Sequence, residues 1–208
     1  VEKYEHSYPH CWRTDKPILY YPLESWFIKT TAYKDRMVAL NKTIQWKPEA
    51  TGTGRFGNWL ENLVDWNLSR SRFWGTPLPI WRTADGTEEK CIGSIAELQA
   101  EIDQAVAAGF MTASPYAGKE LDLHRPYVDE VILLSPKGQK MFRETDLIDV
   151  WFDSGAMPYA QWHYPFENKD IFEANFPADY IAEGVDQTRG WFFTLHALSV
   201  MLFDSVSF

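Results

Sequence analysis

Residues 183–190 bring several chemically capable side chains together in one short stretch. Glu183 and Asp186 offer carboxylates to an ammonium group or to ribose hydroxyls, and the amide of Gln187 can both donate and accept hydrogen bonds. Gly184 permits a ligand to approach the backbone closely. The same stretch could instead be a helix N-cap, with Asp186 or Thr188 as the capping residue and Glu183 simply solvated. The residues alone leave both interpretations open.

Tryptophans and arginines form two other candidate groups. Trp151 and Trp191 could wall an apolar pocket, although tryptophans at such positions often belong to a core. Arg70 and Arg72 stand close to Trp74. A guanidinium binds phosphate through paired hydrogen bonds and an indole can stack on a base, so this cluster fits a nucleic-acid contact. Surface arginines in ordinary salt bridges are the alternative.

The carboxylates of Asp149 and Asp153 suggest a different class of protein. Glycoside hydrolases cleave sugars with two carboxyl groups, and this chain is rich in tryptophans that could stack on sugar rings. A carbohydrate-active domain is therefore one rival interpretation. A non-catalytic module that binds tRNA or another protein is a second, and salt-sensitive tRNA binding would favour it.

The cysteines point to neither a disulfide framework nor a metal site. The chain has 2 Cys, Cys11 and Cys91, which are too few for a disulfide scaffold. His10 and Cys11 are adjacent and lack the spacing that lets two side chains reach one zinc ion. We therefore predict no zinc site in this chain.

Composition restricts the possible partners. The 208 residues carry a net charge of −9, which disfavours nucleic-acid binding through bulk charge but leaves room for a local basic seam. Aromatic residues make up 16% of the chain, which indicates a large aromatic core or a binding surface. The longest apolar stretch, 191–203, is too short to span a bilayer, so we expect a cytoplasmic location without a membrane partner. Because the chain starts at Val1 and stops at Phe208 without a cap, we expect it to be part of a longer protein.

The hydrophobic pattern predicts the elements that must position these residues. Helices are expected over 29–40 and 55–66, with a short strand over 78–81. Residues 84–148 are predicted to be a small α+β insertion. A capping box at Ser94 and Glu97 opens its helix, Gly109 ends that helix, and a hairpin is expected to join 128–134 to 140–143.

The remaining segment leads into the candidate loop. A proline- and aromatic-rich loop is expected over 157–176, followed by a short strand over 178–182 and an apolar helix from Trp191. Strand, polar loop and helix in this order are typical of an α/β sheet whose ligand lies at the carboxyl end of the strand. The amides of a helix start suit an anionic group.

Several ordered motifs resemble the isoleucyl-tRNA synthetases, a family of class I aminoacyl-tRNA synthetases. The valyl and leucyl relatives look different at Trp151-Phe-Asp-Ser-Gly155 and at Asp186-Gln-Thr-Arg-Gly-Trp-Phe192. The similar segments run through nearly the whole chain and comprise residues 6–14, 17–21, 25–29, 58–75, 149–155 and 183–193.

The resemblance implies an enzyme that activates isoleucine with ATP and Mg²⁺ and transfers it to tRNA(Ile). It implies the second half of a Rossmann-like catalytic domain with a small α+β insertion. Residues 1–83 would follow the editing domain, 84–148 would be a connective insertion, and 149–208 would carry the adenylate loop. The resemblance places Glu183, Gly184, Asp186 and Gln187 at the aminoacyl-adenylate. It places Trp151 and Trp191 in the isoleucine pocket. Arg70, Arg72 and Trp74 would lie near the tRNA end.

Two departures limit what the resemblance implies. Neither a His-Ile-Gly-His-like motif nor a Lys-Met-Ser-Lys-Ser-like loop occurs in the chain, so we expect no aminoacylation by this chain alone. Some relatives carry Cys-Pro-His-Cys-Trp-Arg-Cys where this chain has Tyr8-Pro-His-Cys-Trp-Arg-Thr14. Two of three thiolates are missing, so the zinc site of those relatives is not expected here.

Overall fold

The computed structural model describes residues 2–119 and 121–208. The helices are α1 (Lys34–Asn41), α2 (Gly57–Glu61), α3 (Ile95–Ala107), α4 (Val150–Ala160), α5 (Lys169–Asn175) and α6 (Trp191–Phe203), with shorter helical turns η1 (Thr30–Tyr33), η2 (Thr51–Phe56), η3 (Tyr127–Glu130) and η4 (Val185–Arg189). The strands are β1 (Phe27–Ile28), β2 (Trp66–Asn67), β3 (Ser69–Arg70), β4 (Ile80–Thr83), β5 (Glu89–Cys91), β6 (Ile132–Leu134), β7 (Lys140–Arg143) and β8 (Leu147–Ile148).

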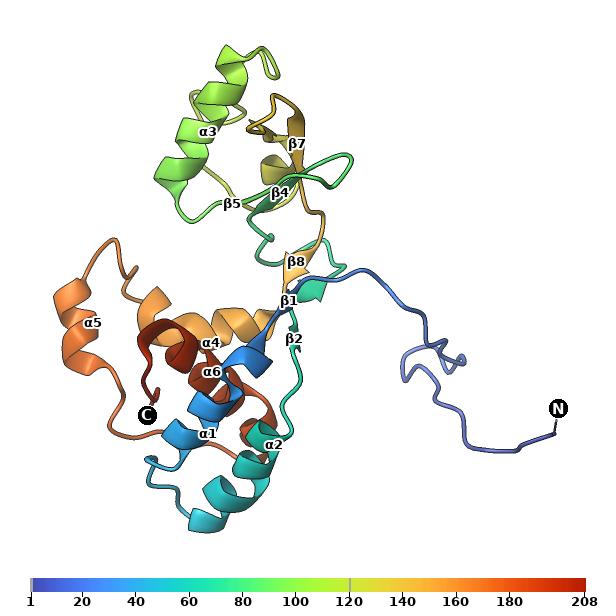
Figure 1. Ribbon diagram of the computed structural model, residues 1–208, viewed down its shortest axis with the longest axis vertical. Coiled ribbons are helices and arrows are strands. Elements are labelled where there is room, and N and C mark those ends of the chain that lie inside the picture. The colour runs from blue at the N-terminus through green and yellow to red at the C-terminus, as the bar shows by residue number, and fades with distance from the viewer. Residues whose placement is uncertain (1, 120) are drawn as a thin grey trace.

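One unit of the fold is a four-stranded antiparallel sheet covered by α3 (Figure 1). Its strand order is β5-β4-β7-β6, and inward residues alternate with outward ones, as in β7, where Met141 is buried and Phe142 exposed. Helix α3 packs Leu98 and Ile102 into the same core. The predicted capping box is confirmed in its first half, because Ser94 Oγ accepts from the backbone N of Glu97 at 3.1 Å.

The other unit is helical, and α6 lies at its centre (Figure 1). The predicted apolar helix from Trp191 is confirmed, and its residues from Phe192 to Val200 are all buried. A helix that is apolar on every side must be surrounded, and α4 packs along one side of it while α1 packs along another. Phe56 and Leu60 complete this second core.

Short strands join the two units. β3 pairs with β8, so the chain entering the sheet unit and the chain leaving it lie side by side. β1 pairs with β2 nearby, and the segment before β1 extends away from both units (Figure 1). β4 lies before residue 84 in the sequence yet pairs with β7 of the sheet unit.

Three predicted elements differ from the structure. The helix expected over 55–66 is shorter, because the chain turns at Asn62 and Trp66 pairs as a strand with Ile28. The loop expected over 157–176 contains the end of α4 and all of α5. The strand expected over 178–182 is wrong: these residues have no regular secondary structure, and they pair with no strand in the described part of the chain. The backbone N of Ala178 donates instead to the carbonyl of Ser207 at 3.0 Å.

All strand pairs in the described part of the chain are antiparallel. None of the helices in the described residues combines the length and apolar character that crossing a bilayer requires.

Candidate functional site

The two tryptophans expected to wall an apolar pocket lie on neighbouring helices. Trp151 is in the first turn of α4, and Trp191 begins α6. The helices pack closely where Gly155 faces Thr194, since a Cβ on Gly155 would lie 2.9 Å from Cβ of Thr194. A side chain at residue 155 would push the helices apart, so glycine sets the spacing between the two elements that carry the tryptophans.

Pro158 helps to orient Trp191. Proline has no N–H, so the carbonyl of Ser154, four residues earlier, lacks its helical donor. The indole Nε1 of Trp191 donates to that carbonyl at 2.9 Å. The ring of Trp151 lies beside Gly190, where a Cβ would come within 3.6 Å of Cη2. Trp151 is 43% exposed, so it presents an open apolar surface near the start of α6.

The polar loop folds back onto the start of α6. Gln187 Oε1 accepts a hydrogen bond from the backbone N of Trp191 at 3.2 Å, and Gln187 Nε2 donates to Asp186 Oδ2 at 3.3 Å. Gln187 therefore satisfies an amide of the first helical turn, a role that the N-cap alternative assigned to Asp186 or Thr188. Gly184 is exposed immediately before η4. Asp186 and Gln187 thus lie at the same helix start as Trp191.

Glu183 faces a different space. Its side chain is exposed and lines a cavity of about 620 Å³ together with Trp46, Tyr180 and Phe192. Neither Trp151 nor Trp191 lines that cavity. The structure therefore divides the predicted site residues into the group at the start of α6 and Glu183 in the adjoining cavity.

Arg70 pairs with a buried carboxylate. Its Nη2 atom lies 2.8 Å from Asp149 Oδ2, and Asp149 is 4% exposed. The same carboxylate accepts from the indole Nε1 of Trp66 at 3.0 Å and from the backbone N of Trp151 at 3.3 Å. Asp149 is thereby the N-cap of α4. The arrangement matches the salt-bridge alternative for Arg70, and it fixes the helix start that carries Trp151.

Asp153, the second carboxyl group of the sugar-cleaving alternative, also has a partner inside the protein. Thr76 Oγ1 donates to Asp153 Oδ2 at 3.2 Å. Burial raises the pKa of Asp153, although the Thr76 hydrogen bond opposes the rise. Since Asp149 has three internal partners, the two groups do not form the accessible carboxylate pair that glycoside cleavage requires.

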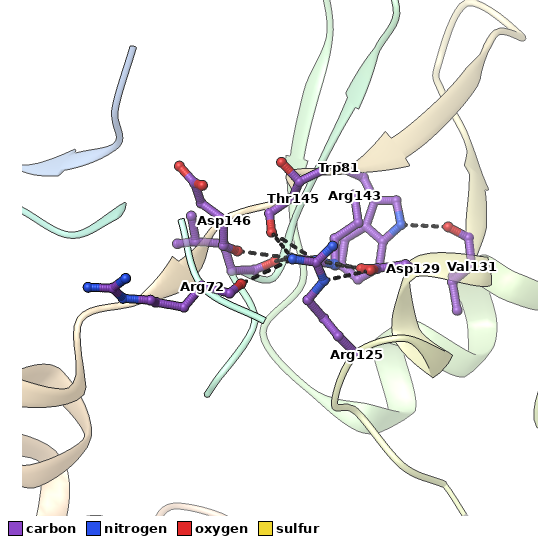
Figure 2. A network of polar contacts seen from close by, with 9 residues as sticks. Arg72, Trp81, Arg125, Asp129, Val131, Arg143, Thr145 and Asp146 are labelled. Atoms are coloured by element: carbon purple, nitrogen blue, oxygen red, sulfur yellow. Dashed lines mark hydrogen bonds and ion pairs between the residues drawn. The ribbon is translucent and has the colours of Figure 1, made fainter. Parts of the chain in front are cut away.

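Arg72 and Trp74 lie on the segment that enters the sheet unit. Both side chains are exposed, and the Trp74 ring stacks on the ring of His124 with centroids 4.5 Å apart and an interplanar angle of 7°. The carbonyl of Arg72 accepts from Arg125 Nη1 at 3.1 Å, as Figure 2 shows. These contacts separate Arg72 and Trp74 from Arg70, which faces α4.

Potential metal ligands are dispersed. Within residues 2–119 and 121–208, no three His, Cys, Asp or Glu side chains lie together as an ion would require. His10 Nδ1 contacts the carbonyl of Tyr8 at 2.9 Å. A hydrogen bond with the Thr14 hydroxyl lowers the pKa of the Cys11 thiol.

The sequence reasoning missed several residues that shape this site. Asp149 was considered only as a sugar-cleaving carboxylate, although an Asp directly before a helix is a recognisable N-cap signal. Pro158 was assigned to a loop, and only its position inside α4 shows that it frees the carbonyl of Ser154. His124 had no signal, because it meets Trp74 only through the tertiary fold.

A helical unit with a polar loop and two tryptophans at a helix start, interrupted by a small α+β unit, fits the resemblance to class I synthetases. The family of class I tRNA synthetases (I, L, M and V) matches residues 5–208, and the chain belongs to this family. Over its whole length it is 76% identical to the isoleucine–tRNA ligase of Cytophaga hutchinsonii, 68% to that of Bacteroides thetaiotaomicron and 53% to that of Thermus thermophilus. It covers 18%, 19% and 19% of those proteins, so it spans about a fifth of their length.

Proposed function

We propose that this chain is part of the catalytic region of an isoleucine–tRNA ligase, which joins isoleucine to ATP as isoleucyl-adenylate and transfers it to tRNA(Ile) in the cytoplasm. High identity along the entire chain to proteins of that name supports the proposal. The observation that carries it is the placement of Trp151, in the first turn of α4, beside Gly190 at the start of α6, where Trp191 and Gln187 also lie.

In this proposal, Trp151 and Trp191 wall the pocket for the isoleucine side chain. The Ser154 hydrogen bond fixes the orientation of the Trp191 indole, and a wall held in this way favours the exclusion of bulkier side chains. Such a pocket discriminates weakly against valine, since one missing methylene is worth about 1–3 kcal/mol, a value known from isoleucine ligases themselves. Removal of mischarged valine is therefore left to a separate editing site.

The polar loop holds the rest of the adenylate. The exposed carboxylates of Asp186 and Glu183 accept hydrogen bonds from the ammonium group of the amino acid or from ribose hydroxyls. In adenylate formation, the isoleucine carboxylate attacks the α-phosphate and pyrophosphate leaves. A rigid loop accelerates such a step by positioning the reactants rather than by forming a covalent intermediate. The described residues do not form a magnesium site of their own.

We further propose that residues 149–208 belong to a Rossmann-like core, with 1–83 as its preceding segment and 84–148 as the connective insertion. Residues 178–182 support this arrangement, because they join no strand in the described part of the chain, and an unpaired segment of this kind can pair with strands elsewhere in a longer protein.

The test uses the full-length protein and isoleucine-dependent ATP–pyrophosphate exchange. Trp151→Ala and Trp191→Ala each remove an apolar wall, so we expect the KM for isoleucine to rise at least about tenfold, while the KM for ATP changes little. Trp12→Ala is the matched control, because Trp12 is 83% exposed and distant in sequence from both. Equal effects of all three variants, or exchange that is insensitive to isoleucine, would overturn the proposal.

A further inference from the structure

A cavity of about 440 Å³ lies where the sheet unit meets the helical unit. The segment before β4 and the start of α3 form most of its wall, and the loop between α4 and α5 contributes the part that comes from the helical unit (Figure 1). The residues proposed for isoleucine and the adenylate do not line this cavity. Cavities of this size between structural units are common places for small ligands.

The wall is apolar both at its buried part and at its exposed edge. Leu78 and Trp81, which form part of the buried wall, are each 1% exposed. At the edge, Ile95 of α3 and Phe166 of the α4–α5 loop are 53% and 60% exposed. Exposed apolar side chains that converge on one opening differ from single ones scattered over a surface. Water fills such a space poorly, because it needs polar partners.

The guanidinium and hydroxyl groups of the wall have partners within the protein. Arg143 donates to Asp129 through Nε and Nη2, and its Nη1 donates to two backbone carbonyls (Figure 2). Thr76 Oγ1 donates to Asp153 Oδ2 at 3.2 Å, and Ser94 Oγ caps α3. A charged group of a ligand would lose its water here without gaining a free partner, which is costly. The wall therefore favours a neutral ligand.

The volume of the cavity sets the size of that ligand. An engineered cavity of about 150 Å³ lined by aliphatic and aromatic side chains holds one benzene ring. The present cavity is about three times as large, so it accepts a molecule with two or three fused rings. A molecule of this size would contact the walls that both units supply.

We propose that this cavity is a binding site for a neutral, hydrophobic small molecule. The buried wall takes the ring system, and an uncharged polar end faces solvent near the exposed side chain of His163. Because the ligand binds the folded chain through both units, it stabilises the arrangement of the sheet unit on the helical unit. The site is independent of isoleucine and of the adenylate.

Isothermal titration calorimetry of the full-length protein with 2-naphthalenemethanol as the probe tests the site. We expect one molecule to bind per chain with a negative change in heat capacity, which marks the burial of apolar surface. Ala96 is exposed in the first turn of α3 and lines the cavity, so Ala96→Phe places a ring there and should weaken binding at least about tenfold. Ala100→Phe is the matched control, because Ala100 is exposed on the same helix and does not line the cavity. Circular dichroism reports whether both variants are folded.

A charged analogue of the probe tests the class of ligand. 2-Naphthoate is similar in size but carries a carboxylate, so it should bind at least about tenfold more weakly. Equal or tighter binding of 2-naphthoate would overturn the proposal, as would equal effects of Ala96→Phe and Ala100→Phe. No binding at about 1 mM probe would overturn it too.

A crystal of the full-length protein soaked in the probe locates the site directly. We expect density for the ring system between Trp81 and Phe166. A segment of the longer protein that fills the cavity instead would overturn the proposal.

Discussion

Asp149 is predicted to be the residue on which the start of α4 depends. Replacing it with alanine removes the N-cap of the helix, worth typically about 1 kcal/mol, and leaves the Trp66 indole N–H without its partner, at a further cost of about 1–3 kcal/mol. Arg70 is 40% exposed and also donates to the Asn67 and Ser69 carbonyls. Loss of its ion pair with Asp149 therefore contributes little to the loss of stability. We expect the free energy of unfolding of the helical unit to fall by about 2–4 kcal/mol.

Urea unfolding followed by circular dichroism measures this change in the 208-residue chain, with the matched variant Asp153→Ala as the control. Asp153 lies in the first turn of α4, but it has one hydrogen bond and burial raises its pKa, so its removal should change stability by less than about 1 kcal/mol. Asp149→Asn retains an acceptor for the Trp151 amide, so its loss of stability should lie between those of Asp149→Ala and Asp153→Ala. A loss below about 0.5 kcal/mol for Asp149→Ala, or an equal loss for Asp153→Ala, would refute the reasoning.

Three other predictions concern packing, protonation and activity. Gly155→Ala should lower stability by about 1–3 kcal/mol in urea unfolding, because its Cβ would meet the Thr194 backbone carbon at 2.9 Å, whereas Gly54→Ala, with no atom within 4 Å, should be nearly neutral. Burial lowers the pKa of His196 from its usual 6.5, so the unfolded chain binds more protons than the folded chain below that pH and stability should fall on acidification. His196→Leu should flatten this dependence of stability on pH, whereas His163→Leu, at an exposed position, should leave it unchanged. Equal pH dependence of stability in the two variants would contradict the assignment of the effect to His196. The 208-residue chain alone should show no isoleucine-dependent pyrophosphate exchange, and a measurable signal would contradict the expectation drawn from its missing ATP-handling motifs.

Local signals in the sequence predicted some elements well. The helix α3 follows from Ser94 and Glu97 at its start and from Gly109, which adopts a φ of +76° just beyond its end. The helix α6 follows from its continuous apolar run. In both elements the residues that decide the structure are near one another in the sequence, so their pattern was sufficient.

Elements that depend on distant partners were not predictable in this way. Residues 178–182 have the composition of a strand, but a strand forms only where another strand satisfies its backbone groups. The tryptophans of the candidate site were found from motifs, whereas their neighbours Ser154 and Gly190 emerge only from the packing of α4 on α6. The same holds for His124, which lies 50 positions from Trp74 in the numbering yet stacks on it.

A crystal structure of the full-length protein with a non-hydrolysable isoleucyl-adenylate analogue tests the central claim most directly. We predict electron density for the isoleucine side chain between Trp151 and Trp191, with the polar part of the analogue at Asp186, Gln187 and Glu183. Density for the analogue at a site that contacts neither tryptophan would contradict the account.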